Sequence, residues 1–254
     1  MDLVKEYADR EKYLLLHGMG EEAVGICQKY HVCVAGGAIT ALFTNARIRD
    51  YDMYFRSAGD RDAVRAAFLE KGKVVSSTDN ALTIKWESVR APFQLIVAED
   101  LLGEPEAIFA KYDFIICMGA YDFLQEAFVL HPHFLKHIAQ RRLVFHSGTL
   151  FPICSLLRAH KYVKRGYTIT GVEIIKMGLA VHSVKIETFR DLRRQLMGID
   201  TAFLKDLTDR FADGVESEAP YQMEKFLEMM DDYIAKVLPI LDTRGEDAPD
   251  DVPG

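Results

Sequence analysis

The chain has 254 residues, 49% of them apolar, which is enough for one large or two small globular domains with a substantial core. Its formal net charge of −7 argues against a protein that coats nucleic acid through a uniformly basic surface. The first ten residues mix charged and apolar side chains, and no later apolar run reaches membrane-spanning length. We therefore expect a soluble, cytoplasmic protein without a membrane partner.

The first half of the chain alternates helix and strand patterns. Residues 3–30 are expected to be helical with a break near Gly18–Gly20, and strands are expected at His31–Ala35 and Asp50–Phe55. The next predicted elements are a helix at 61–71, strands at 74–76, 82–88 and 93–97, a short helix at 104–110 and a strand at 113–118.

The second half of the chain has mainly helical periodicity. Helices are predicted near 131–141, 151–165, 171–180, 187–197, 200–212 and 220–239. The fold class is therefore α+β, with a mixed sheet flanked by helices in residues 1–145 and an all-α domain in 146–241. The acidic tail at 242–254 is rich in Pro, Gly and Asp, which predicts disorder.

Charge is segregated along the chain. Residues 127–172 contain no Asp or Glu. The basic residues in this segment are Lys136, Arg141, Arg142, Arg158, Lys161, Lys164 and Arg165. For any single one of them a solvated helix face is the simpler interpretation, but the whole segment favours an anion-binding surface.

Residues 31–55 combine a glycine turn with a pair of carboxylates. Gly36 and Gly37 follow an apolar strand and precede a helix, an arrangement that exposes backbone N–H groups and allows close approach of phosphate. Asp50 and Asp52 are one residue apart, so on a strand they project from the same face. Because two adjacent carboxylates repel each other, we expect a divalent cation between them, and oxygen ligands favour Mg²⁺.

The segment GGAITALFTNARIRDYD at 36–52 resembles the head domain of class II CCA-adding enzymes and bacterial poly(A) polymerases. These enzymes belong to the nucleotidyltransferase superfamily that includes DNA polymerase beta, and their Gly-Gly-Ala-Val and Asp-x-Asp motifs have the same interval. KYDFIICMGAYD at 111–122 is similar to their Arg-Arg-Asp-Phe-Thr-Ile-Asn motif. LLRAHKYVKRGYTI at 156–169 is similar to their neck helix.

The resemblance implies a polymerase-beta-like head that transfers NMP from an NTP, with ATP or CTP favoured, to an acceptor hydroxyl. Asp50 and Asp52 would be the catalytic residues and would hold Mg²⁺ or Mn²⁺. The nucleotide-binding residues would be Gly36, Gly37, Arg49, Lys111, Asp113 and Arg158. The residues expected to bind an RNA acceptor are Lys161, Lys164 and Arg165, on a helix whose Leu156, Leu157 and Val163 turn toward the core.

Departures from the family pattern leave the acceptor open. Thr40 and Ala41 replace the Arg-Asp that follows the glycines, so Arg47 or Arg49 would have to supply the triphosphate contact. Gln94 is neutral where the superfamily often has another carboxylate, and the neck lacks the Glu-Asp-x-x-Arg base-selecting arrangement.

Three hypotheses therefore stand. The first, which the acid-free segment favours, is transfer to an RNA 3′ end, possibly that of tRNA. The others are transfer to a protein hydroxyl or a small molecule, of the antibiotic or toxin–antitoxin type, and a catalytically inactive nucleotide- or RNA-binding descendant. The intact pair of Asp50 and Asp52 argues against the inactive one.

Overall fold

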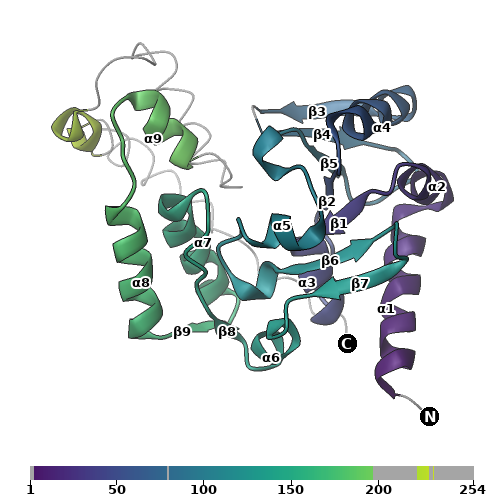
Figure 1. Ribbon diagram of the computed structural model, residues 1–254, viewed down its shortest axis with the longest axis horizontal. Coiled ribbons are helices and arrows are strands. Elements are labelled where there is room, and N and C mark those ends of the chain that lie inside the picture. The colour runs from purple at the N-terminus through teal and green to yellow at the C-terminus, as the bar shows by residue number, and fades with distance from the viewer. Residues whose placement is uncertain (1–2, 79, 197–221, 229–230, 232–254) are drawn as a thin grey trace, which may run out of the picture. The chain divides into compact units, whose positions relative to one another are not determined.

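Seven strands form the main sheet in a computed structural model that describes residues 3–78, 80–196, 222–228 and 231 (Figure 1). Across the sheet the order is β3-β4-β5-β2-β1-β6-β7. The strand bounds are Cys33–Ala35 (β1), Tyr51–Tyr54 (β2), Lys73–Ser77 (β3), Ala81–Lys85 (β4), Phe93–Ile96 (β5), Gly119–Asp122 (β6) and Ala127–Leu130 (β7). Among these strands β2 and β5 are parallel and the other neighbours are antiparallel.

The described helices are α1 (Leu3–Met19), α2 (Glu21–Lys29), α3 (Gly37–Phe43), α4 (Ala58–Lys71), α5 (Pro105–Phe109), α6 (Phe134–Ala139), α7 (Pro152–Lys164), α8 (Gly171–His182) and α9 (Phe189–Leu196). Two 3₁₀ turns, η1 (Glu99–Leu101) and η2 (Ile115–Cys117), and a parallel pair of short strands, β8 (Arg142–Leu143) and β9 (Thr168–Ile169), accompany them. Residues 223–228 are also helical, within the helix predicted at 220–239. No helix within the described residues is both long and apolar enough to cross a membrane.

By its contacts the chain divides into two units, Met1–Val181 and His182–Gly254. The sheet and helices α1–α7 belong to the first unit, and α9 belongs to the second. The division of function between residues 1–145 and 146–241 stays a prediction. The helix expected at 200–212 and the acidic tail at 242–254 lie outside the described residues.

Alternation along β1 and β2 sends side chains to two cores on opposite faces of the sheet. Val34 and Met53 are fully buried in the main core, which they share with Leu15 of α1 and Phe68 of α4. On the other face, Cys33, Ala35, Tyr54 and Ala120 form a smaller core with Ile108 and Phe109 of α5. The helix α5 therefore covers the face to which Asp52 belongs.

The strand expected at 113–118 is wrong. Residues 115–117 form the 3₁₀ turn η2, and the strands follow as the hairpin of β6 and β7, which was not predicted. The run IICM is buried throughout, and a continuous apolar run does not distinguish a strand from another buried segment. The turn of the hairpin includes Glu126 at φ 51°, a position where a glycine or asparagine would have marked the hairpin in the sequence.

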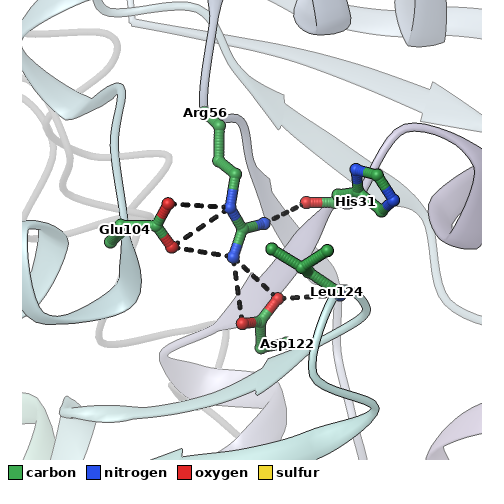
Figure 2. A network of polar contacts seen from close by, with 5 residues as sticks. All are labelled: His31, Arg56, Glu104, Asp122 and Leu124. Carbon is green, nitrogen blue, oxygen red and sulfur yellow. Dashed lines mark hydrogen bonds and ion pairs between the residues drawn. The ribbon is translucent and has the colours of Figure 1, made fainter.

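An ion network fixes the start of α5 (Figure 2). The Arg56 guanidinium donates to both oxygens of Asp122 at 2.9 Å and of Glu104 at 2.8–3.1 Å, and also to the His31 carbonyl. The Asp122 side chain is fully buried, while that of Arg56 is 15% exposed. Glu104 immediately precedes α5, and Arg56 lies just beyond the last residue of β2. The network therefore ties the start of α5 to the C-terminal end of β2, whereas Asp52 lies near the N-terminal end of that strand.

Candidate active site

The carboxylate pair stands at the beginning of β2. Asp52 is the second residue of that strand, and Asp50 immediately precedes it. Tyr51 and Met53 face the main core, where both are buried, which confirms the predicted alternation. Asp50 and Asp52 are both half-buried.

The strands beside Asp52 contribute no further carboxylate. Its register partners are Ala35 on β1 and Gln94 on β5, so a neutral amide occupies the neighbouring position. Among the described residues, no group of three or more His, Cys, Asp and Glu side chains is arranged to hold a metal. Two carboxylates still suit Mg²⁺, because this ion commonly takes its other ligands from water and substrate phosphate.

The glycine turn lies directly against Asp52. Gly36 has φ 75°, a conformation that side-chain-bearing residues rarely adopt. A Cβ atom on Gly36 would stand 3.5 Å from Asp52 Oδ2 and 3.4 Å from the Tyr112 hydroxyl. The fold thus brings together two elements that the sequence analysis had joined only by inference.

Gly36 and Gly37 differ in their surroundings. The Gly36 N–H donates to the Gly119 carbonyl at 3.0 Å, so it is used within the sheet. Gly37 is exposed, and a Cβ added to it would meet nothing within 4 Å. The open side of the turn is therefore at Gly37.

Thr40, where the family motif carries arginine, has a structural role here. Its side chain is buried, and its hydroxyl lies 2.7 Å from the Ile116 carbonyl and 3.1 Å from that of Gly36, as a donor shared between them. This contact joins α3 to η2. Arg47 and Arg49, the sequence-based substitutes for the missing arginine, lie exposed in the loop before β2.

Asp113 and Arg158 form an ion pair. The Arg158 Nε donates to Asp113 Oδ2 at 2.7 Å, and the two side chains are 30% and 8% exposed. The carboxylate raises the pKa of Arg158 well above its usual range. Lys111, by contrast, lies half-exposed beyond the end of α5.

Tyr54 is a buried tyrosine on the same strand as Asp52, and its ring packs against that of Tyr112. Burial raises the pKa of the Tyr54 phenol, and the negative charge of Asp52 raises it further, while the Tyr112 hydroxyl and the charge of Arg158 act in the opposite direction. The sequence analysis missed Tyr54 and Tyr112, although Tyr112 stands in KYDF where the family motif has its second arginine.

The orientation expected for α7 is wrong. Leu156, Leu157 and Val163 are 42%, 39% and 44% exposed, whereas Cys154, Ser155, Ala159 and Tyr162 are buried. The Tyr162 hydroxyl lies 3.1 Å from the Cys117 sulfur, and Arg158 is held by Asp113. These polar contacts, which hydrophobic spacing cannot predict, fix the face that α7 turns inward.

The basic residues of α7 separate into two groups. Arg158 points toward Asp113, whereas Lys164 and Arg165 are exposed at the end of the helix. The Arg165 guanidinium stacks 5.9 Å from the centre of the Tyr162 ring. Lys161 is half-buried between the two groups.

Sequence comparison finds one family model and one curated relative that match this chain. The family model described as Gabija anti-defense 2 family protein matches residues 6–141. A protein of Bacillus phage SPbetaL7 named Gabija anti-defense 2 is 37% identical over 238 residues, which cover 87% of this chain and 58% of the relative. The chain thus spans little more than half the length of that relative.

Structure comparison finds CCA-adding enzymes. A CCA-adding enzyme in complex with ATP has a TM-score of 0.54 at 16% identity, over 97% of this chain and 62% of the other. The apo form I of a CCA-adding enzyme gives 0.52 at 14% identity, over 89% and 58%. The chain therefore has the same fold as these CCA-adding enzymes over most of its length, and the predicted α+β fold class is confirmed.

Proposed function

The chain belongs to the Gabija anti-defense 2 family, and from its fold and site we propose that it is a metal-dependent nucleotidyltransferase. It transfers NMP from an NTP to an acceptor hydroxyl and releases pyrophosphate. The proposal rests most directly on the position of Asp52, whose Oδ2 borders the Gly36 turn with Asp50 two residues away.

The reaction needs a divalent cation. Asp50 and Asp52 would hold Mg²⁺ or Mn²⁺, and the ion would lower the pKa of the acceptor hydroxyl and neutralise triphosphate charge. The acceptor oxygen bonds to the α-phosphorus and its proton passes to solvent. The bond from the α-phosphorus to the bridging oxygen breaks, and pyrophosphate leaves with that electron pair.

The other residues have distinct roles in this proposal. Gly37, on the open side of the turn, supports the triphosphate. Arg158 supplies positive charge from a position fixed by Asp113, and Asp113 adjoins the ribose. Arg49 and Lys111 are exposed or half-exposed and act as outer contacts to the nucleotide.

The proposed acceptor is an RNA 3′ end, possibly that of tRNA, and the proposed NTP is ATP or CTP. The absence of Asp and Glu from residues 127–172 supports RNA, as do the exposed Lys164 and Arg165 beyond Arg158. Solved CCA-adding enzymes of the same fold include complexes with ATP and with CTP.

The name of the phage relative favours a second acceptor class. A protein described as Gabija anti-defense acts against a defence, so a protein hydroxyl of that defence is a candidate acceptor. A small-molecule hydroxyl is the remaining catalytic alternative. The metal chemistry would be the same for every acceptor.

One labelling experiment tests the function and identifies the acceptor. The protein is incubated with each α-labelled NTP, Mg²⁺ and either total RNA, total protein or small metabolites. We expect label in RNA with ATP or CTP. Label in protein or metabolites would move the proposal to that class, and no transfer to any fraction would contradict an enzymatic function.

Gly37→Val should weaken ATP binding by about tenfold, because the branched side chain would occupy space where phosphate meets the backbone. The structure predicts little change in stability, since a Cβ on Gly37 meets nothing within 4 Å. Calorimetry with ATP and Mg²⁺ measures the affinity, and thermal unfolding measures the stability. Unchanged affinity in the folded variant would contradict the phosphate contact.

Lys161→Ala combined with Arg165→Ala should weaken RNA binding and flatten its salt dependence by roughly 0.7–0.9 unit of log-log slope for each charge. ATP affinity should change much less. The matched control is Lys73→Ala combined with Arg90→Ala, two exposed basic residues outside the acid-free segment. An unaltered slope in the first pair would remove these residues from the acceptor surface.

A further inference from the structure

One buried hydroxyl beside the candidate site lacks a well-formed hydrogen bond. The Tyr112 hydroxyl is buried and makes no hydrogen bond of normal geometry with any described residue, and its neighbour is the Tyr54 hydroxyl, with which it makes at most a weak contact. Buried polar groups are nearly always paired in native proteins, so an unpaired one calls for an explanation. One such explanation is that the Tyr112 hydroxyl gains its hydrogen-bond partner only when a ligand binds.

The position of this hydroxyl identifies the partner. Tyr112 Oη and Asp52 Oδ2 border the same point above Gly36, at 3.4 Å and 3.5 Å from where a Cβ would stand. Both distances are ordinary van der Waals contacts, so the φ of 75° at Gly36, rather than lack of space, is what favours glycine there. The Tyr112 ring also packs against Tyr54, with ring centres 6.1 Å apart, and Tyr54 is on the same strand as Asp52.

The backbone around Tyr112 holds the phenol in this place. The Tyr112 N–H donates to the Phe109 carbonyl at 3.0 Å, which joins it to the end of α5. The Tyr112 carbonyl lies 3.1 Å from His146 Nδ1. Asp113, the next residue, is held by Arg158, so the segment is anchored on both sides of the phenol.

We propose that Tyr112 is a positioning residue that donates a hydrogen bond to the Asp52 carboxylate, directly or through one water, when metal and nucleotide occupy the site. This role rests on the proposed nucleotidyltransferase function. A donor of this kind fixes the orientation of a ligating carboxylate, as outer partners of metal ligands commonly do.

A phenol suits this position better than a charged donor. The family motif has arginine where this chain has Tyr112. An arginine would compete with the metal as the counter-charge of Asp52, whereas a neutral phenol orients the carboxylate and leaves its charge for the cation. Burial raises the pKa of Tyr112 well above its usual range, so the phenol remains a donor at neutral pH.

Tyr112→Phe tests the role because it removes only the hydroxyl. We expect Mn²⁺ affinity, measured by electron paramagnetic resonance with and without ATP, to fall by about tenfold. The melting temperature without metal should fall little, since only the weak contact with the Tyr54 hydroxyl is lost. The control is Tyr51→Phe. Tyr51 is a buried tyrosine on the strand of Asp52, but its side chain faces the main core, so this variant should leave Mn²⁺ affinity unchanged.

Asp52→Asn in the same assay separates failure of this role from failure of the function. If Asp52→Asn abolishes Mn²⁺ binding and Tyr112→Phe leaves it unchanged, Tyr112 has no positioning role. A lower melting temperature with unchanged Mn²⁺ affinity would make Tyr112 a structural residue only. If the wild type fails to bind Mn²⁺, or Asp52→Asn binds it equally well, the proposed metal site and the role of Tyr112 are both overturned.

Discussion

Asp52→Asn and Asp50→Asn are each expected to lower the rate of nucleotidyl transfer by at least about 1000-fold, equivalent to about 4 kcal/mol of transition-state stabilisation. Asparagine keeps the shape of aspartate but removes the charge that holds the cation. Because the change also relieves repulsion between two carboxylates, the metal-free protein should be at least as stable as the wild type. Single-turnover transfer of labelled ATP and thermal unfolding measure the two effects.

The control for the carboxylate pair is Asp62→Asn on α4, where the side chain is 64% exposed and paired with Arg61. This variant should transfer at the wild-type rate. Turnover near the wild-type rate in Asp52→Asn or Asp50→Asn would remove that residue from the catalytic site. If either variant failed to fold, the expectation that repulsion between Asp50 and Asp52 destabilises the metal-free protein would be wrong.

Arg158→Ala is expected to destabilise the protein by about 3 kcal/mol, because it leaves the nearly buried Asp113 carboxylate without its counter-charge. ATP affinity should fall as well, since the same guanidinium supplies positive charge to the proposed nucleotide site. Urea unfolding gives the first quantity, and calorimetry with ATP and Mg²⁺ gives the second.

A double-mutant cycle with Asp113→Asn separates the two effects of Arg158. The stability losses of the single variants should not add in the double variant, because each breaks the same ion pair. Arg158→Lys keeps the charge but cannot reproduce the planar guanidinium, so it should recover part of the stability. Additive losses would show that the 2.7 Å contact contributes nothing to stability. Unchanged ATP affinity in folded Arg158→Ala would exclude a nucleotide contact.

Local chemistry made much of the fold predictable. The turn after the first strand could be predicted from its two glycines, because few residues other than glycine adopt the φ of 75° found at position 36. The break between α1 and α2 has the same cause, with Gly20 at φ 83°. Alternation along β2 follows from the pleat, so the separation of Asp52 from Met53 required no knowledge of other strands.

Contacts between distant segments decided the rest of the site. Asp113 and Arg158 were each predicted as nucleotide contacts, but their pairing joins residues 45 apart in the chain. The face of α7 that turns inward carries Arg158 rather than Leu156 and Leu157. The free-energy cost of burying the Asp113 carboxylate without a counter-charge exceeds the cost of leaving two leucines partly exposed.

The sequence by itself thus determined the elements whose cause is local, namely the glycine turn, the aspartate strand and most helices. Only the tertiary structure decided what stands beside Asp52. Gln94 neighbours it through strand register, and the Tyr112 hydroxyl and Asp52 Oδ2 both border Gly36 because α5 packs across that face of the sheet. Spacing along a chain specifies the face on which a side chain lies, whereas its neighbours depend on how the segments pack.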